Sequence, residues 1–145
     1  MNIVKSAVNF NGYRVLYANY ESKAYPKDEN EIKIDPKFNR IIRKVSNNEY
    51  ALILGIQIKS TEDDANLPFD IEVVIEGNFI LENVENHEKT MKINATAIMF
   101  PYLRSTLSML TTLMNINPVV LPTINLIKMF QDDEEQGEAN VITEK

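Results

Sequence analysis

The chain has 145 residues, of which 44% are hydrophobic and 25% charged, so its length and composition are those of one ordinary globular domain. It contains no cysteine and only one histidine, which excludes disulfides, thiolate metal sites and multi-histidine metal sites. The net charge of −6 argues against nucleic acid or an anionic membrane as the main partner, because both are bound through clustered lysine and arginine.

The distribution of apolar residues predicts a cytoplasmic protein. The first residues lack the apolar run and the small-residue cleavage site of a signal peptide. No stretch of about 20 apolar residues could span a bilayer, so we expect no membrane insertion.

Four strands are predicted in the first part of the chain. Residues 13–20 are aromatic and β-branched, and residues 31–35 alternate between apolar and charged side chains. Residues 48–59 alternate with a period of two, which is typical of a half-buried strand. Residues 69–81 repeat this alternation after a polar hairpin loop.

The pattern changes to helical spacing after residue 83. Apolar residues then recur at intervals of three and four, namely at Tyr102, Leu103, Leu107, Leu110 and Met114. Pro101 lies either in the first turn of this helix or inside one longer helix. The helix ends before Pro118, and residues 124–130 predict a short final helix.

Strands first and helices last indicate an α+β fold, with a four-stranded antiparallel sheet and a long C-terminal helix and a short final helix on one face. We expect a single domain over residues 1–131. Residues 132–145 begin with four acids and lack periodicity, which predicts an acidic, disordered tail. We also expect a homo-oligomer, a dimer or a tetramer, with its interface on the helix at Leu103, Leu107, Leu110 and Met114.

The residues that could carry chemistry are few. His87 has no nucleophile motif beside it, so a structural role is favoured over general-base catalysis. The adjacent acids at residues 62–64 do not have the spacing of a calcium loop and are predicted to be solvated. We therefore expect no enzyme, with no catalytic residues, no metal and no cofactor.

The most unusual segment is residues 116–130, where apolar residues are interrupted by Pro118 and Pro122. An extended apolar backbone held by prolines is hard to bury, because its polar groups need partners. The segment is therefore either an exposed interaction surface or a part of the core or of an oligomer interface.

Two stretches resemble a known family. Ile98–Arg104 (Ile-Met-Phe-Pro-Tyr-Leu-Arg) resembles the Leu-Phe-Pro-Tyr-x-Arg signature of SecB, the bacterial protein-export chaperone. Pro118–Leu126 resembles the Pro-x-Leu-x-Leu-x-Pro-[VI]-Asn-Phe loop of that family, in the same order along the chain. The resemblance implies a SecB-like fold, a dimer of dimers and a chaperone without nucleotide hydrolysis. Such a chaperone holds unfolded, export-bound polypeptides in surface grooves and passes them to the SecA motor.

The resemblance also implies site residues. The polypeptide groove would be lined by an early strand and by the loop after the helix, at Ile32, Ile34, Pro118, Val120, Leu121, Ile124 and Leu126. SecA would be bound by acidic residues of the sheet, Glu21 and Glu72. Four residues match the strand that packs under the helix and are assigned to the core: Tyr50, Leu52, Leu54 and Ile56.

Two further functions stay open. The chain departs from the family pattern at Asn117, Leu126 and Asp70, and SecB-like proteins also serve as dedicated chaperones for antitoxins of toxin–antitoxin systems. In that role the partner would be one antitoxin. A third alternative is a non-chaperone oligomeric scaffold whose apolar loop is wholly interfacial.

Overall fold

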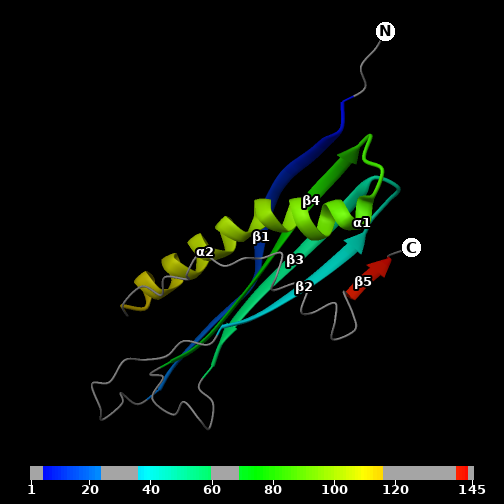
Figure 1. Cartoon of the computed structure of the whole chain (residues 1–145). Helices are drawn as coiled ribbons and strands as arrows, with labels where there is room; N and C mark the ends of the chain where they lie inside the picture. The colour runs from blue at the N-terminus through cyan, green and yellow to red at the C-terminus, as the bar shows by residue number, and fades with distance from the viewer. Residues whose placement is uncertain (1–4, 24–35, 60–68, 116–139, 144–145) are drawn as a thin grey trace.

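A long twisted sheet forms one layer of the molecule, and helices cross one face of it (Figure 1). The computed structural model describes residues 5–23, 36–59, 69–115 and 140–143. The elements in chain order are β1 (Ala7–Ser22), β2 (Lys37–Lys44), β3 (Glu49–Ile58), β4 (Phe69–Glu82), α1 (His87–Thr90), the π-helical segment η1 (Met91–Ala95), α2 (Thr96–Leu113) and β5 (Asn140–Thr143). This order confirms the predicted α+β class. None of the helices described is long and apolar enough to cross a membrane.

The sheet has the strand order β1-β4-β3-β2-β5. Its first four strands are antiparallel, as predicted, and β5 adds a short strand parallel to β2. The prediction of a disordered tail is therefore wrong for residues 140–143, whose backbone pairs with Ile41–Lys44. The β-branched residues Val141, Ile142 and Thr143 favour this strand. The predicted short final helix lies outside the described residues.

The strand β2 was not predicted. Its sequence carries four basic residues and places Ile41 and Ile42 side by side, so it lacks the alternation that marks β3 and β4. The predicted strand at residues 31–35 lies outside the described residues. The ends of β3 and β4 lie within one residue of their predicted positions, because both strands bury one face along their whole length. In β4 the other face is only partly buried, whereas β3 also buries Ala51 and Gly55 on it.

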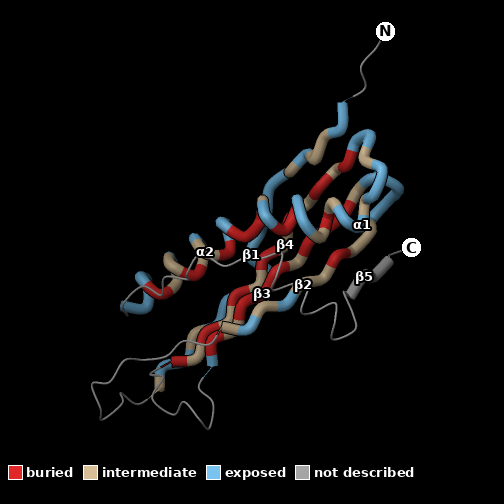
Figure 2. Tube along the Cα trace, in the orientation of Figure 1, coloured by how far each residue is buried: buried red, intermediate tan, exposed pale blue. Residues whose placement is uncertain are grey.

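The core lies between the sheet and the helices (Figure 2). The strands contribute mainly Tyr50, Leu52, Leu54, Ile56, Ile58, Phe69, Ile71, Val73, Ile75, Phe79 and Leu81. The helical layer contributes Met91, Ala95, Met99, Phe100, Leu103 and Leu107. The assignment of Tyr50, Leu52, Leu54 and Ile56 to the core is confirmed.

The helical layer begins at His87, after the change of pattern at residue 83 and before the first of the spaced apolar residues at Tyr102. Asn86 caps α1, and its side chain accepts a hydrogen bond from the Lys89 amide at 3.0 Å. Pro101 lies inside α2, as in the alternative of one longer helix. Beyond the end of α2, Asn115 has a φ of +56°, a left-handed conformation that asparagine tolerates at a helix end.

Candidate functional site

The residues predicted to line the polypeptide groove are Ile32, Ile34, Pro118, Val120, Leu121, Ile124 and Leu126. All seven lie outside the described residues, so their role stays a prediction. The described residues do form three other surfaces: the outward side of α2, the edge of the sheet at β1 and the sheet face opposite the helices.

The outward side of α2 differs from the predicted interface. Leu103 and Leu107 are 0% exposed and belong to the core of the chain itself, which leaves them no surface for a second copy. Leu110 packs partly against this core. The most exposed apolar side chains of α2 are Met109 (63%) and Leu113 (76%), and Met114 beside them is 40% exposed.

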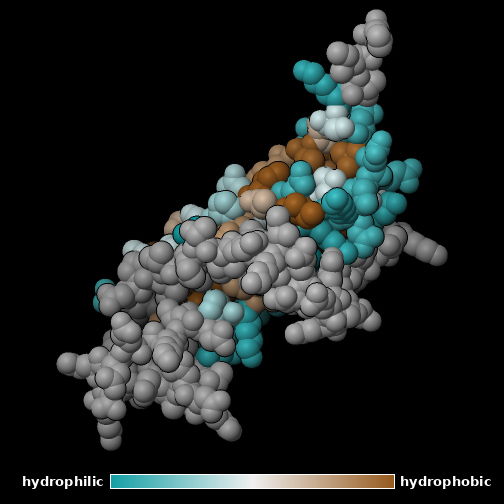
Figure 3. Space-filling model, in the orientation of Figure 1, coloured by the Kyte–Doolittle hydropathy of each residue, from teal (hydrophilic) through white to brown (hydrophobic). Residues whose placement is uncertain are grey.

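Met109 and Leu113 line a shallow hollow of about 370 Å³ together with Ser105, Ser108 and Thr112. Their spacing of four places both on one side of the helix, a second apolar stripe that the sequence analysis missed. This stripe is visible in the sequence once the buried stripe through Leu103 and Leu107 is set aside. Figure 3 shows further hydrophobic surface over the first part of the helical layer, with hydrophilic surface at its α1 end.

The strand β1 forms one edge of the sheet and pairs with β4 alone among the described strands. It is irregular, with register shifts between Phe10 and Tyr13 and between Val15 and Tyr17. Its exposed apolar side chains include Val15, Leu16 and Tyr17. Proteins usually cover or charge a long apolar edge of this kind, because it can pair with another chain.

The two acids predicted to bind SecA lie at the same end of the outer sheet face. Glu21 of β1 lies opposite Asp70 of β4, and Glu72 lies two residues further along β4. The Glu72 carboxylate accepts a hydrogen bond from the Gln57 side chain at 3.0 Å and lies 3.8 Å from the Lys59 ammonium. Asp70 lies 3.2 Å from the ammonium of Lys23. The chain's own lysines thus partly neutralise this acidic end.

The middle of the same face carries a charged cluster around Glu76. The guanidinium groups of Arg14 and Arg43 each lie 3.2 Å from the Glu76 carboxylate, from β1 on one side and β2 on the other. Charges of both signs therefore alternate across this face. The Arg14–Glu76 pair is exposed on its arginine side and contributes little to stability, whereas the Arg43–Glu76 pair is part-buried.

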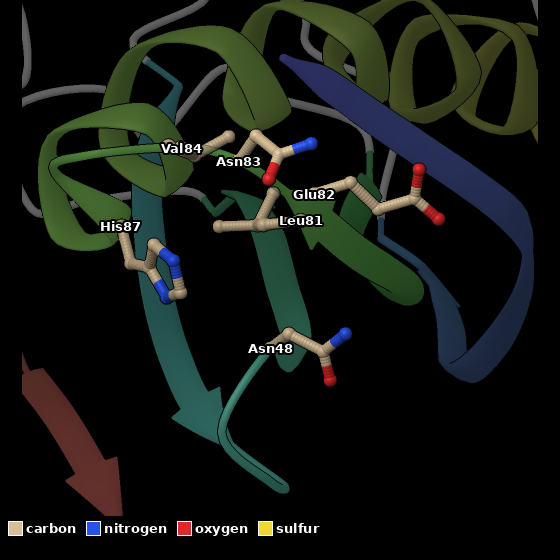
Figure 4. A pocket seen from close by; sticks show the side chains of 6 residues that line it. All are labelled: Asn48, Leu81, Glu82, Asn83, Val84 and His87. Atoms are coloured by element: carbon tan, nitrogen blue, oxygen red, sulfur yellow. The ribbon is translucent and has the colours of Figure 1, made fainter. Parts of the chain in front are cut away.

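His87 occupies a polar hollow at the start of the helices. Its Nδ1 lies 3.0 Å from the Tyr50 hydroxyl, and this partner fits the structural role predicted for it. Burial, helped by the nearby Glu88 carboxylate, raises the pKa of Tyr50 above its ordinary value. The hollow, of about 500 Å³, is lined by Asn48, Leu81, Glu82, Asn83, Val84 and His87 (Figure 4). This lining contains no hydroxyl, thiol or amine nucleophile among the described residues.

Comparisons with known proteins agree with the fold. An uncharacterized protein of Methanocaldococcus jannaschii is 32% identical over 145 residues, covering 97% of this chain and 92% of that protein. The protein-export protein SecB of Magnetococcus marinus is 26% identical over 125 residues, covering 83% of this chain and 80% of that protein. The solved structure of a Mycobacterium tuberculosis SecB-like chaperone, in complex with a peptide from the HigA1 antitoxin, matches with a TM-score of 0.67 at 12% identity, covering 81% of this chain and 91% of that chain. The family model for SecB, the preprotein translocase subunit, matches residues 17–137, and the chain therefore belongs to the SecB family.

Proposed function

We propose that this protein is a cytoplasmic chaperone that holds non-native polypeptides without hydrolysing nucleotide or using a cofactor. The observation that carries this proposal is the family match over residues 17–137, which includes both the Ile98–Arg104 motif and the Pro118–Leu126 loop. A holding chaperone must bind many sequences, so it relies on apolar contacts and backbone pairing rather than on polar readout. Weak contacts repeated along an extended chain then add up to a useful affinity.

Export is the first specific role that we propose, with SecA as the partner that receives the polypeptide. Protein-export SecB proteins among the relatives support it. Glu21 and Glu72 are the residues proposed to bind SecA. Because Lys59 lies beside Glu72 and Lys23 lies beside Asp70, a basic partner has to compete with these lysines. We therefore expect SecA binding to be weak and to depend on salt.

An antitoxin is the second partner that we propose, because the similar M. tuberculosis chaperone was solved with an antitoxin peptide. In this role the protein binds one small partner tightly. We distinguish the two roles by measuring the binding of purified SecA to the chain and to two variants. Export predicts that Glu72→Lys abolishes binding, while Glu82→Lys, an exposed acid at the end of the same strand, leaves it unchanged. Absence of SecA binding by the unchanged chain would contradict the export role.

We further propose that copies of the chain assemble into a homo-oligomer. The surfaces that support it are the exposed stripe of Met109, Leu113 and Met114 and the edge at β1, which no second strand covers among the described residues. Pairing of identical patches about a twofold axis is the usual way in which such surfaces are covered.

The experiment that tests the holding function is suppression of aggregation of a chemically unfolded client, with and without ATP. We expect suppression that does not depend on ATP. Leu121→Asp should reduce it, because a buried carboxylate opposes apolar binding. Val45→Asp, in the exposed β2–β3 turn, is the matched control and should retain it. An assembled oligomer that suppresses no aggregation would favour the scaffold alternative.

A further inference from the structure

The edge of the sheet at β2 is occupied by the chain's own β5. Residues Ile41–Lys44 pair with Asn140–Thr143 in parallel, and β5 lies beside β2 in Figure 1. Residues 37–40 of β2 pair with no second neighbour in the described part of the chain. The opposite edge, β1, has no such covering strand among the described residues.

Opposite charges accompany this pairing. The strand β2 contains four basic residues and no acid. Arg40 is bonded to a helix carbonyl and Arg43 to Glu76, whereas Lys37 and Lys44 pair with no carboxylate that the structure describes. Residues 132–145 contain six acids and one lysine. The strand β2 is therefore basic, with Lys44 in the part that β5 covers and Lys37 in the part beyond it, and the sequence around β5 is acidic.

The pairing between β5 and β2 is small enough to be replaced. It extends over four residues, shorter than most strands, and parallel pairing is slightly less stable per residue than antiparallel pairing. An extended peptide that adds to a sheet edge gains its affinity from the same backbone hydrogen bonds. A longer strand would form more of them along β2, and an antiparallel strand would pair slightly more stably per residue.

We propose that β2 is a strand-docking edge and that β5 is its internal occupant. The external partner is an extended polypeptide segment rich in β-branched residues and flanked by acids, which displaces β5 and adds to β2. The identification of such segments with chaperone clients rests on the proposed function, whereas the docking edge itself does not.

The test uses the full-length protein and a fluorescent peptide with the sequence of residues 138–145. In the variant Val141→Pro/Ile142→Pro, positions 141 and 142 have no backbone N–H to donate to β2. This loss should weaken the pairing of β5 and free the edge of β2. This variant should bind the peptide about tenfold more tightly than the unchanged chain, as expected if β5 occupies the edge in about nine of ten molecules. Val141→Thr/Ile142→Thr retains β-branched residues and amides, and should bind like the unchanged chain.

Two further variants test whether the lysines of β2 contribute to peptide binding. Adding Lys37→Glu/Lys44→Glu to the proline variant should abolish peptide binding, whereas adding Lys59→Glu, directly after the end of β3, should leave it intact. Equal binding by the proline variant and the unchanged chain would overturn the proposal. Aggregation suppression should also rise in the proline variant. If the peptide results hold while the unchanged chain and the variant both suppress no aggregation, the docking edge stands and the chaperone function fails.

Discussion

Met99 of α2 lies directly over Gly77 of β4, and a Cβ atom at position 77 would overlap the Met99 thioether. Met99 is fully buried, and the contact lies in the core between helix and sheet. A side chain at position 77 would hold the two layers apart. The absence of a side chain at Gly77 therefore allows α2 to approach the sheet closely at this point.

We predict that Gly77→Ala destabilises the protein by about 1–3 kcal/mol, the usual cost of adding a methyl group to a packed core. Gly55→Ala is the matched control on the neighbouring strand, where the new methyl group would meet the side chain of exposed Asn39. That side chain can turn into solvent, so we expect little loss. Urea denaturation measures both variants, and equal losses would contradict the close approach at Gly77.

The sequence predicted the parts of the fold whose pattern is local. Alternation in β3 and β4 is visible because the face of each strand that lies toward the helices is buried along its whole length. It is absent from β2, where Arg40 points to the helix side and bonds to the carbonyl of Lys92 at 2.8 Å. Only the packed structure makes a basic residue suitable for that position, so the pattern of β2 could not be read in advance.

The surfaces were predicted less completely than the core. That Glu21 and Glu72 lie at one end of the sheet follows from the register of β1 against β4, which two irregularities in β1 shift. A sequence does not reveal such shifts. The helical spacing of Leu103 and Leu107 correctly marked an apolar stripe, but spacing alone does not tell whether the stripe faces its own sheet or a second chain.

Arg40 should stabilise the junction between η1 and α2. Its guanidinium donates to the carbonyl of Lys92 and lies 3.3 Å from the Thr96 hydroxyl, both on the helix. We predict that Arg40→Met costs about 1.5–3 kcal/mol, as expected when a charged donor to a part-buried carbonyl is removed.

Lys37→Met, on the exposed side of the same strand, is the control for Arg40→Met and should change stability by less than about 0.5 kcal/mol. Urea denaturation gives both values. Amide hydrogen exchange should also accelerate in η1 for Arg40→Met alone. Unchanged exchange there would show that the Arg40 contact does not hold this segment.

The raised pKa of Tyr50 predicts an alkaline loss of stability. Burial and Glu88 raise the pKa of Tyr50 above its ordinary 10.0, so the unfolded chain releases the phenolic proton more readily than the folded one. Stability from this group is thus complete below pH 10.0 and is lost as the pH rises through the folded pKa.

Tyr50→Phe removes both the hydrogen bond and the titrating group. We expect it to cost about 1 kcal/mol at neutral pH. The difference in unfolding free energy between the unchanged chain and Tyr50→Phe should then shrink above pH 10.0. Denaturation at a series of pH values measures this difference, and comparison of the two chains cancels the other tyrosines. A difference that stayed constant with pH would contradict the raised pKa.

Alanine substitution should lower the stability of the chain at Leu107 but not at Leu113, although both residues belong to α2. Leu107 is 0% exposed in the core, so Leu107→Ala should cost about 2–5 kcal/mol of unfolding free energy. Leu113 is 76% exposed, so Leu113→Ala should leave the stability of the single chain almost unchanged.

If α2 packs against a second copy through Met109 and Leu113, Leu113→Asp should place a carboxylate in that interface and dissociate it. Sedimentation velocity at micromolar concentration measures the assembly. Ser105→Asp, on the border of the same hollow, is the control for added charge and should weaken assembly less. A monomeric unchanged chain, or an oligomer that Leu113→Asp leaves intact, would remove this side of α2 from the interface and leave the β1 edge as the surface to test.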